Sequence, residues 1–161
     1  WTSSDLPANP NWPRFEFSEE IIDAISPGIG LAISLTHDVS AGVLAFAKSP
    51  GSLVGRVLHC RPAGGPSQQA VRCGHHAWVL AESAVQKVRS LQGAGSEPLH
   101  VFIAGPNAFA FFLGQHRQAL GPSVVYEWDF ARQRRGVPID ADELDADGQD
   151  HDPVEPAEPV A

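Results

Sequence analysis

The sequence predicts an α/β fold, a three-layer sandwich with helices on both faces of a mainly parallel sheet of about four strands or more. The first observation is a set of short apolar runs at residues 29–36, 53–60 and 99–104, which is typical of strands buried on both faces. The second is the helical periodicity between these runs, which makes strands and helices alternate along the chain. Such alternation favours parallel strands joined by right-handed crossovers.

Residues 98–122 predict a buried strand, a tight turn and an amphipathic helix. The apolar run 99–104 leads into the turn Gly105-Pro106-Asn107, and apolar residues then recur at helical spacing until Gly121-Pro122 ends the helix. In sheets of this kind, the usual ligand site is the crevice beyond the carboxyl end of the strand, facing the first free N–H groups of the helix.

Three further elements complete the predicted fold. Residues 39–48 form a short apolar helix that ends at Ser49-Pro50-Gly51. Residues 74–92 show apolar side chains at three- and four-residue spacing, with charged side chains between them, which predicts an amphipathic helix. Residues 123–130 form the last strand.

The chain divides into three segments. Residues 1–20 contain Pro7, Pro10 and Pro13 and show no periodicity, so we expect an extended arm or linker whose aromatic residues dock on another surface. Residues 21–138 contain the predicted strands and helices and form the folded domain. Residues 139–161 hold nine acidic residues and no Lys or Arg, which predicts a disordered acidic tail.

Charge and cysteine content indicate the class of protein. The formal net charge of the chain is -8, whereas residues 29–138 hold 10 basic and 5 acidic side chains and could bind an anionic ligand. No apolar run approaches the roughly 20 residues of a membrane span. The first residues lack the pattern of a signal peptide. We therefore expect a cytoplasmic protein in which Cys60 and Cys73 are reduced.

Three segments with functional side chains follow predicted strands. They are Thr36-His37-Asp38, His59-Cys60-Arg61 and Ala104-Gly105-Pro106-Asn107. Because the carboxyl ends of parallel strands meet at one edge of a sheet, Asn107 and the N–H groups of the helix start could hold phosphate oxygens or a base edge, with Arg61 as the counter-charge. The alternative is that residues 105–107 are only a turn and that Asn107 is an N-cap.

Metal binding and catalysis have less support. Zinc ligand types occur at His59, Cys60, Cys73, His75 and His76. The two cysteines are not part of two close ligand pairs, and adjacent His75 and His76 at a helix start cannot both point the same way, so we expect no metal site and no cofactor. The sequence contains no nucleophile elbow, phosphate loop or dinucleotide fingerprint, which favours a protein that is not an enzyme.

Two stretches resemble a known protein family. LHVFIAGPNAFAFFLGQHRQALGPSVVYEWDF combines a buried strand, a helix containing F-x-L-G, the phrase ALGP and a strand with YEW, and it is similar to the SAVED sensor domains of bacterial anti-phage signalling. GIGLAISLTHDVSAGV resembles the opening strand of that family, with its T-x-D turn into a helix. The resemblance spans residues 30–130.

The resemblance implies a Rossmannoid, CARF-like fold and a sensor function. SAVED domains look like two fused CARF-like units, and residues 21–138 match one of them, the second. In the family, a cyclic oligonucleotide made by a partner nucleotidyltransferase or a type III CRISPR complex drives oligomerisation and switches on an effector. The implied partners are the cyclic oligonucleotide, the missing first half, an effector and further copies of the chain. Neither a membrane nor duplex nucleic acid is implied.

Carried over by position, the resemblance also implies a site. Its lining residues would be Thr36, His37, Asp38 and residues 104–107, with His75 and His76 as further candidates. The mildly basic body agrees with a cyclic tri- or tetranucleotide. We therefore expect a non-enzymatic sensor in antiviral defence (CBASS or CRISPR). Two alternatives stay open: a scaffold that binds a partner chain without a nucleotide, and a sensor that also cleaves its ligand.

Overall fold

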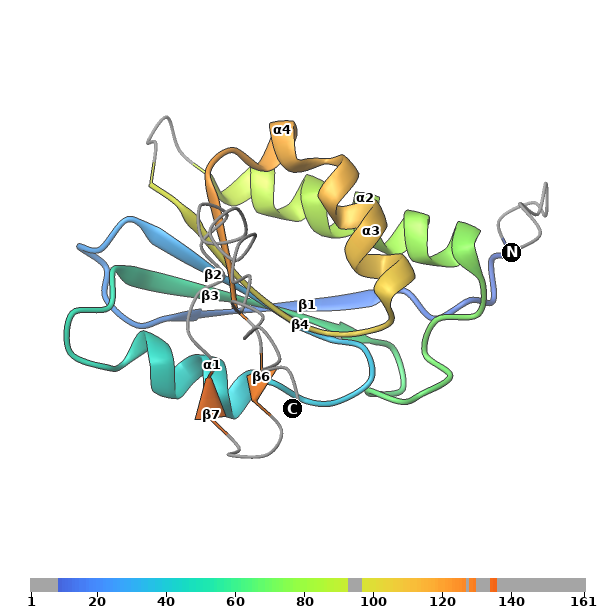
Figure 1. Ribbon diagram of the computed structural model, residues 1–161, viewed down its shortest axis with the longest axis horizontal. Coiled ribbons are helices and arrows are strands. Elements are labelled where there is room, and N and C mark those ends of the chain that lie inside the picture. Colours follow the sequence, from blue (N-terminus) through green and yellow to red (C-terminus); the bar gives the residue numbers. More distant parts are fainter. Residues whose placement is uncertain (1–8, 93–96, 127, 130–133, 136–161) are drawn as a thin grey trace, which may run out of the picture.

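The fold is built on one five-stranded sheet (Figure 1). The computed structural model describes residues 9–92, 97–126, 128–129 and 134–135. The strand order is β1 (Phe15–Ile21), β3 (Val54–Pro62), β2 (Gly28–Ser34), β4 (Leu99–Ala104) and β5 (Ser123–Tyr126). Strands β3, β2, β4 and β5 run parallel to one another, and β1 runs antiparallel to β3. The predicted α/β fold with a mainly parallel sheet is confirmed.

Helices flank the sheet, with α1 on one face and α2, α3 and α4 on the other (Figure 1). Their bounds are α1 (Ser40–Ala47), α2 (Gly74–Leu91), α3 (Asn107–Gln115) and α4 (Arg117–Leu120). Because successive side chains of a strand point to opposite faces, the inner strands contribute to two cores. Leu31 and Ile33 of β2 belong to the core under α2 and α3, and Ala32 belongs to the core under α1. Strand β2 is buried along its whole length, which explains its apolar sequence.

The edge strand β1 occupies part of the arm that the sequence predicts at residues 1–20. All seven residues of β1 pair with β3, from Phe15 opposite Pro62 to Ile21 opposite Arg56. Phe15 is buried, and its ring lies 5.9 Å from that of Phe109, so the expected docking is confirmed for this aromatic residue. Exposed glutamates on β1 are typical of an edge strand, and they interrupt the apolar run by which inner strands are found.

The predicted helix in residues 108–120 is two helices in the structure. Helix α3 ends at Gln115, and the short α4 begins at Arg117. Gly121 has a φ of +74°, a backbone conformation that favours glycine, and it ends α4 as the sequence predicts. The last strand is shorter than residues 123–130, because β6 (Trp128–Asp129) pairs instead with β7 (Arg134–Arg135) in a separate two-stranded ribbon.

The acidic tail at residues 139–161 lies outside the described residues, as do residues 1–8 of the arm. The disorder of the tail therefore stays a prediction. Within the part of the chain that the structure describes, no helix combines the length and the hydropathy needed to cross a membrane.

Candidate functional site

A cavity of about 560 Å³ opens at the carboxyl edge of the parallel strands. Its walls are the loops that follow β2, β3 and β4, and its size is typical of small-molecule sites. The lining residues are Thr36, His37, Ser67, Gln68, Val71, Arg72, Cys73, Ile103, Ala104, Gly105, Pro106, Asn107 and Ala108. The structure thus brings together Thr36, His37 and residues 104–107 of the site predicted from the sequence.

The wall after β4 presents the start of α3. Pro106 is the N-cap residue, in an extended conformation, and α3 begins at Asn107. The first N–H groups of a helix have no acceptor within the helix. Asn107 and Ala108, which open α3, both line the cavity. The alternative in which Asn107 is the N-cap is wrong, and its exposed side chain is available at the cavity.

The wall after β2 is fastened to the end of β4. The carbonyl oxygen of Ala104 accepts hydrogen bonds from the backbone N–H groups of Leu35, at 2.8 Å, and Thr36, at 2.9 Å. His37 is exposed, and its Nδ1 lies 3.2 Å from Oγ1 of Thr36. The polar side chains of Thr36 and His37 therefore have a defined place relative to the start of α3.

The third wall consists of residues that sequence reasoning missed. They lie in the loop between β3 and α2 and are Ser67, Gln68, Val71, Arg72 and Cys73. The backbone N–H of Ser67 donates a 2.9 Å hydrogen bond to the carbonyl of Leu35, which holds this loop against the end of β2. Arg72 adds an exposed cation to the cavity. The signal that could have found it is its position just before the helix start at Gly74, because a crossover helix starts at the carboxyl edge of the sheet.

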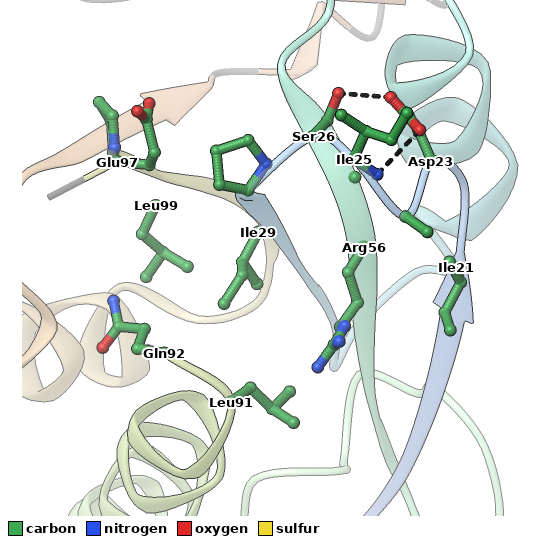
Figure 2. A pocket seen from close by; sticks show the side chains of 14 residues that line it. Ile21, Asp23, Ile25, Ser26, Ile29, Arg56, Leu91, Gln92, Glu97 and Leu99 are labelled. Carbon is green, nitrogen blue, oxygen red and sulfur yellow. Dashed lines mark hydrogen bonds between the residues drawn. The ribbon is translucent and has the colours of Figure 1, made fainter. Parts of the chain in front are cut away.

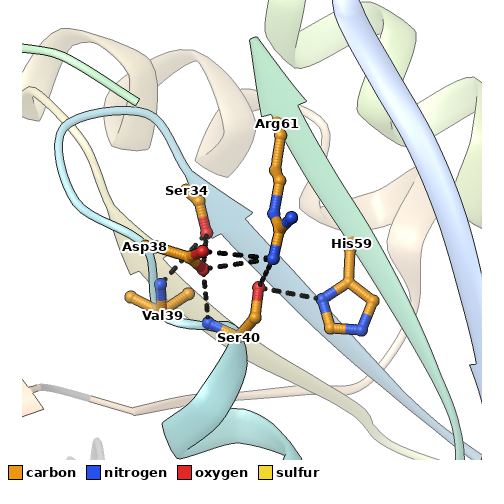
Figure 3. A network of polar contacts seen from close by, with 6 residues as sticks. All are labelled: Ser34, Asp38, Val39, Ser40, His59 and Arg61. Carbon is orange, nitrogen blue, oxygen red and sulfur yellow. Dashed lines mark hydrogen bonds and ion pairs between the residues drawn. The ribbon is translucent and has the colours of Figure 1, made fainter. Parts of the chain in front are cut away.

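Asp38 and Arg61 belong to a polar network (Figure 3) and are not among the residues that line the cavity. Nη2 of Arg61 is 3.1 Å from Oδ2 of Asp38 and 2.7 Å from Oγ of Ser40. Oδ1 of Asp38 accepts a 2.9 Å hydrogen bond from the N–H of Ser40, and Oγ of Ser34 accepts a 3.1 Å hydrogen bond from the N–H of Val39. The network therefore supplies acceptors for N–H groups at the start of α1, and it engages the charge of Arg61 within the protein.

The network also determines which of its members are charged. Burial acts to raise the pKa of Asp38, but hydrogen bonds from Ser40 and the charge of Arg61 outweigh it, so the pKa is lowered. His59 is buried with its Nδ1 3.2 Å from Oγ of Ser40, and its pKa is lowered by burial and by the charge of Arg61. Near pH 7 the carboxylate is therefore charged and the imidazole of His59 is neutral.

His75 and His76 do not line the cavity. His76 is buried, and its ring stacks on that of Trp12 with centroids 5.1 Å apart. His75 is half-buried, and its ring centroid lies 5.9 Å from that of Trp12 and 5.7 Å from that of Trp78. Both imidazoles therefore contact the N-terminal segment.

A second cavity, of about 370 Å³, lies at the opposite, amino end of the parallel strands (Figure 2). Its walls combine apolar side chains such as Ile29 and Leu91 with Arg56. In open α/β sheets, ligands bind beyond the carboxyl ends of the strands, so the 560 Å³ cavity is the stronger candidate. Among the described residues, no three His, Cys, Asp or Glu side chains are grouped as a metal site requires.

Comparisons with known proteins agree with the resemblance drawn from the sequence. The model of the SAVED family, described as "SMODS-associated and fused to various effectors sensor domain", matches residues 1–136. A curated protein, CD-NTase-associated protein 4 of Enterobacter hormaechei subsp. hoffmannii (strain UCI 50), is 35% identical to the chain over 132 residues. That match covers 78% of the chain and 26% of the relative, so the chain spans about a quarter of the length of this relative.

Proposed function

The chain belongs to the SAVED family of sensor domains, and on this premise we propose that it binds a cyclic oligonucleotide at the carboxyl edge of its sheet as a sensor in anti-phage signalling. The observation that carries the proposal is the convergence of Thr36, His37, Arg72 and the start of α3 on one cavity. Such a cavity offers both a positive charge and hydrogen-bond donors to a phosphodiester.

Each part of the cavity suits one part of a nucleotide. The first N–H groups of α3 and the guanidinium of Arg72 can bind phosphate oxygens, since a helix start and a cation both favour anions. The side chains of His37 and Asn107 can bond base edges or ribose hydroxyls. Val71 and Ile103 supply apolar surface on which a base can pack.

In this proposal one copy of the chain supplies only part of the site. A ring of three or four nucleotides is larger than the drug-sized molecules that such a cavity encloses. We propose that a cyclic tri- or tetranucleotide also contacts a second CARF-like half, either in the same longer protein or in a neighbouring copy. A ligand shared by two surfaces stabilises their association by mass action, which would couple binding to oligomerisation and to an effector.

Isothermal titration calorimetry of the complete protein tests the proposal. The panel contains cyclic di-, tri- and tetranucleotides, each paired with the linear oligonucleotide of the same length. We expect binding heat for one ring size, weaker binding of its linear form, and a rise in mass by light scattering once that ring is added. If none of the cyclic oligonucleotides in the panel gives binding heat, the proposed sensor function is wrong.

We propose no catalytic role for the chain. Chromatography of the cyclic oligonucleotide after long incubation with the protein tests whether the chain cleaves it. Intact ligand is the expected result, whereas linear products would identify a sensor that also cleaves its ligand.

A scaffold is the second candidate function, and exposed apolar side chains at the amino end of the sheet favour it. Ile21, Ile25 and Leu53 are 66%, 91% and 58% exposed. Groups of exposed apolar residues mark contacts with other proteins. A scaffold would form its complex before any nucleotide is added, so light scattering of the ligand-free protein separates the two functions.

A further inference from the structure

His76 joins two distant segments through their main chains. Its side chain is nearly inaccessible, with 1% of the residue exposed. Nε2 lies 2.8 Å from the carbonyl oxygen of Pro13, and Nδ1 accepts a 3.1 Å hydrogen bond from the backbone N–H of Arg72. A neutral imidazole with its proton on Nε2 satisfies both contacts, because it has one donor and one acceptor.

Besides the bond from Arg72, two further backbone hydrogen bonds join the loop between β3 and α2 to other described segments of the chain. The N–H of Ala63 donates to the carbonyl of Arg14 at 2.8 Å, at the start of the loop. The N–H of Ser67 donates to the carbonyl of Leu35 at 2.9 Å, in its middle. The hydrogen bond from the N–H of Arg72 to His76 holds the end of the loop. The guanidinium group that lines the cavity belongs to this same residue, Arg72.

The N-terminal segment supports His76 from the other side. The ring of Trp12 stacks on the imidazole at an interplanar angle of 28°, and Pro13 accepts the hydrogen bond from Nε2. The N-terminal segment thus contacts both ends of the loop between β3 and α2. The carbonyl of Arg14 binds the start of the loop directly, and the carbonyl of Pro13 is linked to its end through His76.

We propose that His76 is a positioning residue of the ligand cavity, which holds Arg72 on the cavity wall by accepting the hydrogen bond from its backbone N–H. The binding consequence of this inference rests on the proposed function. Without the imidazole, the N–H of Arg72 loses its acceptor, and the end of the loop is free to carry the guanidinium away from the site of the phosphate.

Two conservative variants separate the two contacts of the imidazole. In His76→Asn, Oδ1 takes the place of Nδ1, so the acceptor for Arg72 is kept and the donor to Pro13 is lost. In His76→Gln, Nε2 takes the place of the imidazole Nε2, so the donor to Pro13 is kept and the acceptor for Arg72 is lost. Calorimetry with the cyclic oligonucleotide should show affinity lowered about tenfold in His76→Gln, the fold-change that corresponds to one lost buried hydrogen bond. His76→Asn should bind nearly as well as the wild type.

Val85→Ala is the control for a general loss of stability. Val85 is buried on the same helix and belongs to the core, and it does not line the cavity. We expect this variant to melt at a lower temperature and to keep its affinity for the ligand. Equal losses of affinity in His76→Gln and His76→Asn, or losses that follow the melting temperature in all three variants, would overturn the positioning role.

Hydrogen exchange of the ligand-free protein provides a second readout. The amide of Arg72 should exchange faster in His76→Gln than in the wild type and should stay protected in His76→Asn. Unchanged protection in His76→Gln would contradict the proposal. If the wild type binds no nucleotide of the panel, the proposed function fails, and the exchange of the Arg72 amide still decides whether His76 holds the loop.

Discussion

Nη2 of Arg61 lies 3.1 Å from Oδ2 of Asp38, so the cation that the sequence assigns to the ligand is paired within the protein. Arg61 is the penultimate residue of β3, and Asp38 lies in the loop after β2, so their pairing links the ends of two neighbouring parallel strands. The cavity itself is lined by Arg72. The two arginines therefore differ in their surroundings, since Arg61 pairs with the loop before α1 and Arg72 lines the candidate ligand cavity.

Arg72→Ala should weaken binding of the cyclic oligonucleotide by roughly 10- to 100-fold, because a hydrogen bond to a charged group contributes about 1.5–3 kcal/mol. The loss should shrink as salt rises, since screening weakens the contribution of an exposed cation. Calorimetry at two salt concentrations measures both effects. Arg89→Ala, on the exposed part of α2 and away from the cavity, is the matched control and should bind as the wild type does.

His37→Ala and Asn107→Ala should each weaken ligand binding without unfolding the domain. Both side chains are exposed and line the cavity, so their removal leaves the core unchanged. Surface substitutions of this kind alter stability by about 0.5 kcal/mol or less. Thermal melts and calorimetry on the same samples test the pair. Affinity that is unchanged in both variants would place the ligand elsewhere on the molecule.

The inner part of the fold could be predicted from the sequence because burial on both faces leaves a clear pattern. Strands β2, β3 and β4 are apolar runs, and α2 shows the periodicity of a helix with one buried face. Strand β1 could not be found in this way. It lies at the edge of the sheet, Glu16 and Glu19 are exposed, and its pairing with β3 depends on a segment far away in sequence.

The candidate site was predictable only where it follows directly from strand ends. The predicted residues that line the cavity stand at strand ends: Thr36 and His37 follow β2 closely, and residues 104–107 begin with the last residue of β4. Because the two strands are parallel, the topology brings these residues to one cavity. Arg72 lies ten residues after the end of β3, outside any strand end, and only its position just before the start of α2 at Gly74 indicates that it returns to the cavity. Arg61 has the expected location at the end of a strand, but its side chain lies on the α1 face, where Asp38 and Ser40 engage it.

Asp38→Ala should lower the free energy of unfolding by about 1 kcal/mol, the usual cost of losing a side-chain acceptor at a helix start. Oδ1 of Asp38 accepts the N–H of Ser40, whereas the ion pair with Arg61 joins two side chains that are 51% and 44% exposed. Exposed ion pairs contribute little, so the capping bond should dominate. Asp38→Asn, which keeps an acceptor oxygen, should retain most of the stability in urea unfolding. A loss in Asp38→Asn as large as in Asp38→Ala would show that the charge dominates.

Gly55→Ala and Gly114→Ala should have opposite effects on stability. A Cβ on Gly55 would fall on the backbone carbonyl of Ser26, which cannot move as a flexible side chain would, so we expect a loss of about 3 kcal/mol. Gly114 lies within α3, and a Cβ there meets no atom within 4 Å, so alanine should stabilise the helix by about 0.5 kcal/mol. Urea unfolding of both variants checks this, and a stable Gly55→Ala protein would contradict the close approach of the two segments.

The protein should lose stability as the pH falls below about 6.5, through three histidines. Burial lowers the pKa of His59, His76 and His100 in the folded state. At His59, the charge of Arg61 also lowers the pKa, whereas Glu20 and Asp38 act to raise it. At His76, the charges of Arg72 and His75 also lower the pKa, whereas the hydrogen bond to the carbonyl of Pro13 acts to raise it. The unfolded chain therefore binds protons at a higher pH than the folded protein does.

The sign of the pH effect follows from that difference in bound protons. Above the ordinary histidine pKa of about 6.5, these three side chains are neutral in both the folded and the unfolded state. Their contribution to the free energy of unfolding is then fully present. As the pH falls through 6.5 the unfolded state takes up protons first, so the free energy of unfolding decreases until the folded histidines also titrate. Urea unfolding at pH 7.5, 6.5 and 5.5 should show this decrease, and His76→Asn should make it shallower. Stability that stays constant across this range would mean that the three imidazoles gain protons as readily in the folded protein as in the unfolded chain.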